Sequence, residues 1–184
     1  MGLTFAGVDV GGEKKGFHIA LTDGHAILEI AAELSLPQAV EWLAQRSPAV
    51  VAIDAPPQAL IQGPETRAAE RALSQAGFRI QWTRRQGTGL PAPEWMNHGA
   101  ALWHELKRTL PHAQLIETFP TAATAQLANS SIHLPLSTLA LLTPHRATLK
   151  DALDACIAAD VAARAHQGLT HVYGPEDELG PIHA

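Results

Sequence analysis

The feature that most restricts the fold is a series of short strand-like runs near the N-terminus, each closed by turn residues. Residues 4–10 (TFAGVDV), 16–22 (GFHIALT) and 25–31 (HAILEIA) have the apolar content typical of strands. The second and third runs are joined by Asp23-Gly24, a dipeptide that favours a tight hairpin turn. We therefore expect a meander of three antiparallel strands.

A helix and a further strand follow the meander. Residues 35–46 (SLPQAVEWLAQR) have helical spacing, with Ser35 as the expected N-terminal cap. The next run, 49–57 (AVVAIDAPP), is almost continuously apolar, which is typical of a central strand covered on both faces. The helical crossover permits the strand at 49–54 to pair in parallel with the first strand.

The remaining segments complete a mixed α/β architecture. The sequence predicts helices at 65–76, 94–110, 121–128, 136–142 and 146–167, a strand at 113–120, and an irregular loop at 79–93. The tail from about residue 170 is polar and rich in Gly and Pro, so we expect it to be loose. No repeat or linker interrupts the 184 residues, and we expect one domain built on a sheet.

Composition narrows the possible functions. With 46% apolar and 17% charged residues the chain is globular, and no apolar run reaches the roughly 20 residues of a membrane span. We find no signal peptide and a single cysteine, Cys156, so we expect a cytoplasmic protein without membrane association. A net charge of −5 is unusual for a protein that binds many phosphates. It implies a small substrate, a local basic patch or a metal that supplies positive charge.

Three strand-like runs carry an acid where they end: Asp9, Asp54 and Glu117, each followed closely by Gly or Pro. Ligands of open α/β sheets bind at the carboxyl ends of strands, so we expect these acids to converge on one cleft. Neighbouring carboxylates repel, and a bound cation such as Mg²⁺ or Mn²⁺ relieves that repulsion. Taken singly, each acid is more simply a strand-end residue in contact with water.

The last helix carries two more acids, Asp151 and Asp154, on one face. Their neighbours are alanines, and a face of small residues favours close packing on a sheet, which would turn the acids toward the cleft. A solvated helix face is the alternative. We expect an ion pair between Asp160 and Arg164. The expected core stripe of this helix is Leu149, Leu153, Cys156, Ile157 and Val161.

Several motifs in chain order resemble the DUF429-type family of predicted ribonuclease H-like nucleases: GVDVGG, AIDAPP, RAAER, IETFP and KDALDACIAAD. The closing Asp-x-x-Asp-Ala also resembles the last motif of Holliday-junction resolvases. The resemblance extends from residue 7 to about residue 165. It implies a ribonuclease H-like fold, with a central mixed sheet of five strands, three antiparallel then two parallel, flanked by helices. It also implies a hydrolase that cleaves phosphodiester bonds of DNA or RNA by a two-metal mechanism.

The resemblance also implies roles for the acids. Asp9, Asp54, Asp151 and Asp154 would hold two Mg²⁺ or Mn²⁺ ions, with Asp9 between them. Glu117 belongs to the family's Glu-x-x-Pro motif and is a further catalytic candidate. The resolvases usually carry Glu where this chain has the shorter Asp54, which alters the expected metal spacing.

Basic side chains are candidates for contact with a nucleic acid. The substrate-binding candidates are Arg67, Arg71, Arg84 and Arg85, with Trp82 as a surface on which a base can stack. A solvated loop and local ion pairs on a helix are the alternatives. His18, His98 and His104 are candidate proton carriers, although a structural role is the simpler interpretation for each.

Two other functions remain open. GVDVGG also resembles the first phosphate loop of actin-like kinases and ATPases, although those proteins need two such domains and carry Ser or Thr where Gly12 stands. A domain of the same fold that binds a ligand or nucleic acid without turnover agrees with the acidic balance. Metal-dependent cleavage that stops on Asp9→Asn would distinguish the nuclease from both. The sequence does not predict the oligomeric state.

Overall fold

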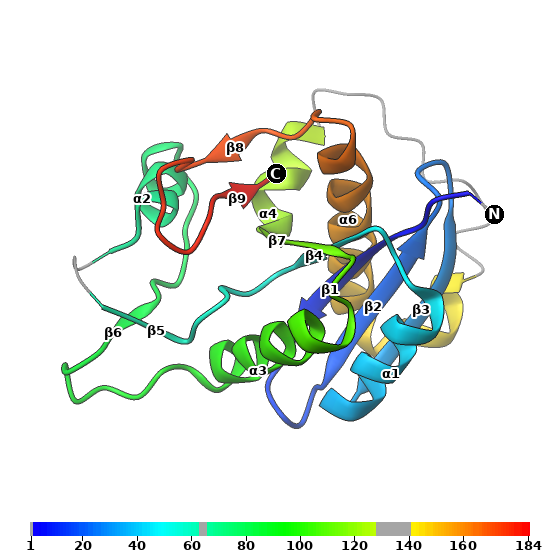
Figure 1. Cartoon of the computed structure of the whole chain (residues 1–184), viewed down its shortest axis with the longest axis horizontal. Coiled ribbons are helices and arrows are strands. Elements are labelled where there is room, and N and C mark those ends of the chain that lie inside the picture. Colours follow the sequence, from blue (N-terminus) through cyan, green and yellow to red (C-terminus); the bar gives the residue numbers. More distant parts are fainter. Residues whose placement is uncertain (1, 63–65, 128–140) are drawn as a thin grey trace.

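A mixed sheet with helices on both faces forms the centre of the molecule (Figure 1). The computed structural model describes residues 2–62, 66–127 and 141–184. The strands are β1 (Phe5–Val10), β2 (Phe17–Thr22), β3 (Ile27–Leu34), β4 (Val50–Ile53), β7 (Gln114–Thr118), β8 (Val172–Tyr173) and β9 (Ile182–His183), in the spatial order β3-β2-β1-β4-β7-β9-β8. A separate pair, β5 (Leu60–Ile61) and β6 (Arg84–Arg85), is parallel.

The pairing confirms the order expected for the first five strands of the sheet. β1, β2 and β3 form the antiparallel meander, and β1, β4 and β7 are parallel neighbours. The expected number of strands is wrong, because the sheet has seven. The extra strands come from the tail that we expected to be loose: β9 pairs in parallel with β7, and β8 pairs antiparallel with β9.

The helices lie close to their predicted positions. They are α1 (Leu36–Arg46), α2 (Ala68–Gln75), α3 (Glu94–Thr109), α4 (Pro120–Leu127) and α6 (Leu149–His166), with a 3₁₀ helix, η1 (Thr143–Thr148), directly before α6. Ser35 is the N-cap of α1, as predicted, and its backbone N–H donates to Gln38 Oε1 at 2.9 Å. The helix predicted at 136–142 falls almost entirely outside the described residues.

Two hydrophobic layers hold the helices on the sheet. On one face, α1 and α3 contribute Leu43, Leu102 and Leu106 to a core shared with Val8 of β1 and Ile19 of β2. On the other face, α6 lies across β1 and β2, as Figure 1 shows. Burial on both faces explains why the β4 sequence is continuously apolar.

Alanines, rather than large side chains, form the contact between α6 and the sheet. Ala152, Ala155, Ala158, Ala159 and Ala162 are fully buried. The predicted stripe is therefore wrong in part: Cys156 and Val161 are buried, but Leu149 is 44% exposed. The close packing expected of an alanine face is confirmed at Gly7, where an added Cβ would lie 2.0 Å from the backbone nitrogen of Ala159.

Candidate metal centre

Parallel pairing of β1 and β4 brings Asp9 and Asp54 to the same edge of the sheet. Val8 is level with Ile53, and the backbone N–H of Asp54 donates to the Val8 carbonyl oxygen at 2.9 Å. The next residue on each strand, Asp9 and Asp54, therefore projects from the face covered by α6. Local strand sequence and register together place these acids as predicted.

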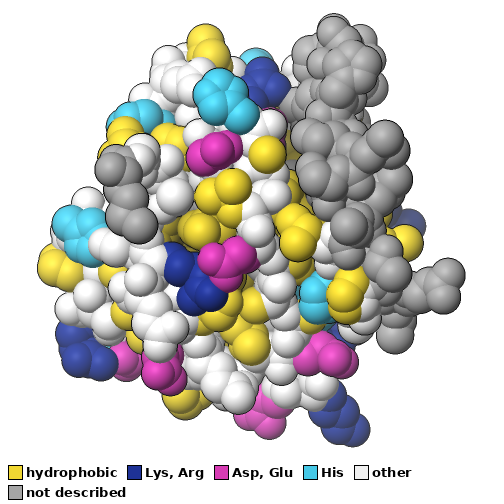
Figure 2. Space-filling view, turned by 90° about the vertical axis from the view of Figure 1, so that its right-hand side faces the viewer, with side chains coloured by type: hydrophobic (Ala, Val, Ile, Leu, Met, Phe, Trp, Pro, Cys, Tyr) yellow, Lys and Arg dark blue, Asp and Glu magenta, His cyan; other side chains and the backbone are white. Residues whose placement is uncertain are grey.

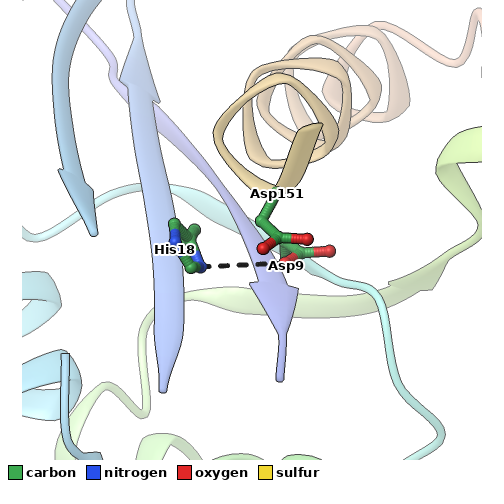
Figure 3. Close-up of side chains that lie close together, drawn as sticks. All are labelled: Asp9, His18 and Asp151. Atoms are coloured by element: carbon green, nitrogen blue, oxygen red, sulfur yellow. Dashed lines mark ion pairs between the residues drawn. The ribbon is translucent and has the colours of Figure 1, made fainter. Parts of the chain in front are cut away.

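The N-terminal part of α6 supplies the other acids. Asp151 lies in the first turn of the helix, and Asp154 follows one turn later. Because the alanine face rests directly on β1, the start of α6 lies over the C-terminal end of that strand. Figure 3 shows the carboxylates of Asp9 and Asp151 side by side, with His18 on the neighbouring strand. Ligand atoms of these three residues lie within 4.8 Å of one another.

Burial and mutual repulsion perturb the carboxyl groups of this cluster. Burial, followed by the charges of Asp151 and Asp154, raises the pKa of Asp9 to about 7. Burial, followed by the charges of Asp9 and Asp154, raises the pKa of Asp54 well above its usual range. The acids of α6 therefore act electrostatically on the acids of the strands, and we call Asp9, Asp54, Asp151 and Asp154 the acidic cluster.

Two lysines pair with the acids of α6. Lys15 Nζ lies 3.1 Å from Asp151 Oδ2, and Lys150 pairs with Asp154 one helical turn away. The side chains of Lys15 and Lys150 are 65% and 83% exposed, so these pairs are screened by water and are weak. The sequence interpretation did not include either lysine.

His18, considered from the sequence only as a proton carrier, lies within ligand distance of Asp9 and Asp151. It lies directly opposite Asp9 in the β1–β2 ladder and is fully buried. Its Nδ1 is 3.8 Å from Asp9 Oδ2, and neither ring nitrogen has a hydrogen-bond partner among the described residues. Burial lowers its pKa below the usual value. The other histidines considered lie elsewhere: His98 contacts the Gly11 carbonyl oxygen at 2.8 Å, and His104 is exposed on α3.

Glu117 lies beside the acidic cluster: it lines the same pocket as Asp54, and its charge is a further cause of the raised pKa of Asp54. In the β4–β7 ladder it is level with Ile53, the residue before Asp54. Its two carboxylate oxygens accept hydrogen bonds of 2.9 and 2.8 Å from the guanidinium of Arg67. The geometry therefore gives this glutamate a buried ion-pair partner, and the catalytic role predicted for it stays a prediction.

Arg67, which the sequence predicts as a substrate contact, lies in a buried network of ion pairs. Arg67 is 2% exposed, and besides Glu117 it contacts Asp177 Oδ1 at 3.2 Å through Nε. Asp177 comes from the tail and also accepts the backbone N–H of Ala69, at the start of α2, at 2.9 Å. This buried network joins α2, β7 and the tail, and it leaves no donor of Arg67 directed at solvent.

The other predicted basic residues are exposed. Arg71 donates to the Thr66 carbonyl oxygen, and Arg84 and Arg85 form β6. Arg84 and Trp82 line an open groove, together with Arg79. Arg79 also lines an adjoining pocket of about 320 Å³ that reaches Asp54 and Glu117. The loop predicted at 79–93 thus connects to the edge of the acidic cluster.

The net charge of −5 raised the question of whether the surface carries a local basic patch. On the face shown in Figure 2, acidic and basic side chains of the described residues are interspersed, with hydrophobic side chains between them. This face carries no broad basic patch among those residues. Arg79 and Arg84 come together instead in the groove described above.

The fold and the acidic cluster together define an α/β protein with carboxylates close to the C-terminal ends of two parallel strands. Residues 7–178 match the family model described as "Protein of unknown function (DUF429)", and the chain belongs to this family. No curated protein and no solved structure was found to match the chain. Within the described residues, none of the helices is long and apolar enough to cross a membrane.

Proposed function

We propose that this chain is a metal-dependent nuclease with a ribonuclease H-like core, which hydrolyses phosphodiester bonds of DNA or RNA. One observation carries the proposal: Asp9 of β1 and Asp151 of α6 present carboxylate oxygens to one point, and Asp54 and Asp154 are near enough to act on this site electrostatically. The β3-β2-β1-β4-β7 order, with its antiparallel meander and two parallel strands, supports the ribonuclease H-like assignment.

The donor set fits a divalent cation. Asp9 and Asp151 offer carboxylate oxygens close together, and Asp54 and Asp154 add negative charge at the border of the site. Hard oxygen donors of this kind suit Mg²⁺ or Mn²⁺. Divalent ions held here would polarise the phosphate and lower the pKa of the attacking water. The raised pKa of Asp9 supports the same view, because an unneutralised carboxylate is disfavoured at this position.

The groove beside the cluster supports a nucleic-acid substrate. Arg79 and Arg84 can contact phosphates, and the indole of Trp82, in a residue 37% exposed, can stack on a base. The pocket between Asp54 and Arg79 would bring a bound strand from this groove to the carboxylates. A small phosphorylated compound would use the pocket without the groove.

The proposal is tested by cleavage of fluorescently labelled DNA and RNA, single-stranded and duplex, with Mn²⁺, Mg²⁺ or EDTA. We expect cleavage that needs the metal and that falls by about 100-fold or more in Asp9→Asn. Asp160→Asn is the matched control, because Asp160 lies on the same helix as Asp151 and pairs instead with Arg164 at 4.0 Å. Metal-independent cleavage, or equal loss in both variants, would contradict the proposal. Binding of nucleic acid without cleavage would favour the non-catalytic alternative.

A further inference from the structure

The imidazole of His18 lies where a third protein ligand to a cation would lie. Register fixes this position: β1 and β2 are antiparallel, and Asp9 and His18 are directly opposed, so both side chains project from the same face. Asp151 reaches the same point from α6. Three separate elements therefore present one nitrogen and two oxygen donors to a common centre, as Figure 3 shows.

The distances favour shared coordination over a direct hydrogen bond. His18 Nδ1 and Asp9 Oδ2 are 3.8 Å apart, which is too long for a hydrogen bond. Ligands that each lie about 2.0–2.2 Å from one ion are separated by roughly 3–4 Å. The three ligand atoms lie within 4.8 Å of one another, so a small closing movement brings all of them to an ion.

Burial makes a passive role for His18 energetically unfavourable. The side chain has no exposed surface, and within residues 2–62, 66–127 and 141–184 neither ring nitrogen meets a hydrogen-bond partner. Buried polar atoms in native proteins are nearly always satisfied, and a metal bond satisfies the nitrogen that faces Asp9. The surrounding residues thus fix the position of the imidazole without forming a hydrogen bond to either ring nitrogen.

We infer that His18 is a direct ligand of a divalent ion held by Asp9 and Asp151, and that this nitrogen directs the site toward a transition metal and away from Mg²⁺. The inference rests on the proposed function and specifies its metal. Mg²⁺ strongly prefers oxygen ligands, whereas a donor set of one imidazole and two carboxylates suits Mn²⁺, Fe²⁺ or Zn²⁺.

The test uses Mn²⁺ alone as the probe on the metal-free full chain. Pulsed electron paramagnetic resonance detects a nitrogen bonded to Mn²⁺ by its nuclear modulation. We expect ¹⁴N modulation in the wild type, a ¹⁵N pattern after labelling with ¹⁵N-histidine, and loss of the modulation in His18→Gln. His145→Gln is the matched control and should keep the ¹⁴N modulation. His145 is near enough to affect the pKa of His18, but it is not one of the three residues whose ligand atoms lie together.

Titration calorimetry supplies the second measurement. We expect Mn²⁺ to bind the wild type at least about tenfold more tightly than Mg²⁺, and His18→Gln to remove most of this difference while leaving Mg²⁺ affinity nearly unchanged. The spectrum of labelled wild type decides the question even where His18→Gln does not fold.

The outcomes separate this inference from the proposed function. Suppose that Mn²⁺ binds the wild type without nitrogen modulation and that this binding is lost in Asp9→Asn. This result would overturn the role of His18 and leave the nuclease proposal standing. A wild-type chain that binds neither Mn²⁺ nor Mg²⁺ would overturn both.

Discussion

Substitution of Gly7 by alanine tests whether the α6–β1 contact positions the site. The added Cβ would meet backbone atoms only: the Ala159 nitrogen at 2.0 Å, and the Ala155 oxygen and Ala158 carbonyl carbon at 2.4 Å. An ordinary contact needs about 3.4 Å or more, so the helix must retreat by about 1.4 Å. Backbone atoms cannot rotate away as a side chain can. We therefore expect destabilisation of about 3 kcal/mol, at the upper end for overpacked cores.

Thermal unfolding measured by circular dichroism checks this value. A loss of about 3 kcal/mol in a chain of this size lowers the melting temperature by roughly 6–12 °C. Gly2→Ala is the control, because nothing lies within 4 Å of a Cβ added there. The same displacement carries Asp151 away from Asp9, so Mn²⁺ affinity should fall in Gly7→Ala and not in the control. Equal melting temperatures for Gly7→Ala and Gly2→Ala would refute the packing argument.

Two further predictions concern the buried charges. The pKa of Asp9 is raised from 3.8 to about 7 in the folded protein, so the folded state holds a proton that the unfolded chain releases across this window. The free energy of unfolding of the metal-free wild type should therefore fall by a few kcal/mol as the pH rises from about 4 to about 7, and Asp9→Asn should not show this fall. Urea unfolding of both proteins at pH 5 and pH 8 in EDTA measures the difference. Identical pH dependences would argue against the raised pKa of Asp9. Arg67→Met leaves Glu117 and Asp177 buried without their cation, so we expect a loss of about 3–5 kcal/mol in urea unfolding, whereas exposed Arg71→Met should change little. Unchanged stability with weakened nucleic-acid binding in Arg67→Met would contradict the structural role and favour the predicted contact of this arginine with substrate.

The strand order was predictable because its signals are local. The Asp23-Gly24 turn, the continuously apolar run at 49–54 and the helical crossover between them define the meander and the first parallel pair. Asp9 and Asp54 followed directly, since each stands at the end of a strand. The strands of the tail were not predictable in this way, because each has only two residues and exists through pairing with a distant partner.

His18 was considered as a proton carrier but not placed beside Asp9, because the sequence was interpreted along each strand and not across the strand pair. The β1–β2 turn is short, with Gly11 N–H donating to the Gly16 carbonyl oxygen at 3.0 Å, and it places Asp9 opposite His18. If Gly11 and Gly16 are paired across the turn, Asp9 and His18 are two positions farther along each strand and lie opposite each other. The ion pairs of Arg67 carried no such signal, because Glu117 and Asp177 reach this arginine through tertiary packing alone.

The buried network around Arg67 has a consequence for the order in which this chain can mature. A ribosome delivers Arg67 and Glu117 well before Asp177 and the strand β9 that lies beside β7. Until those late residues emerge, the guanidinium of Arg67 in a nascent chain lacks the carboxylate of Asp177, and β7 lacks its neighbour β9. The sheet from β3 to β7 can assemble during translation, whereas the network around Arg67 closes only after Asp177 and β9 have been synthesised.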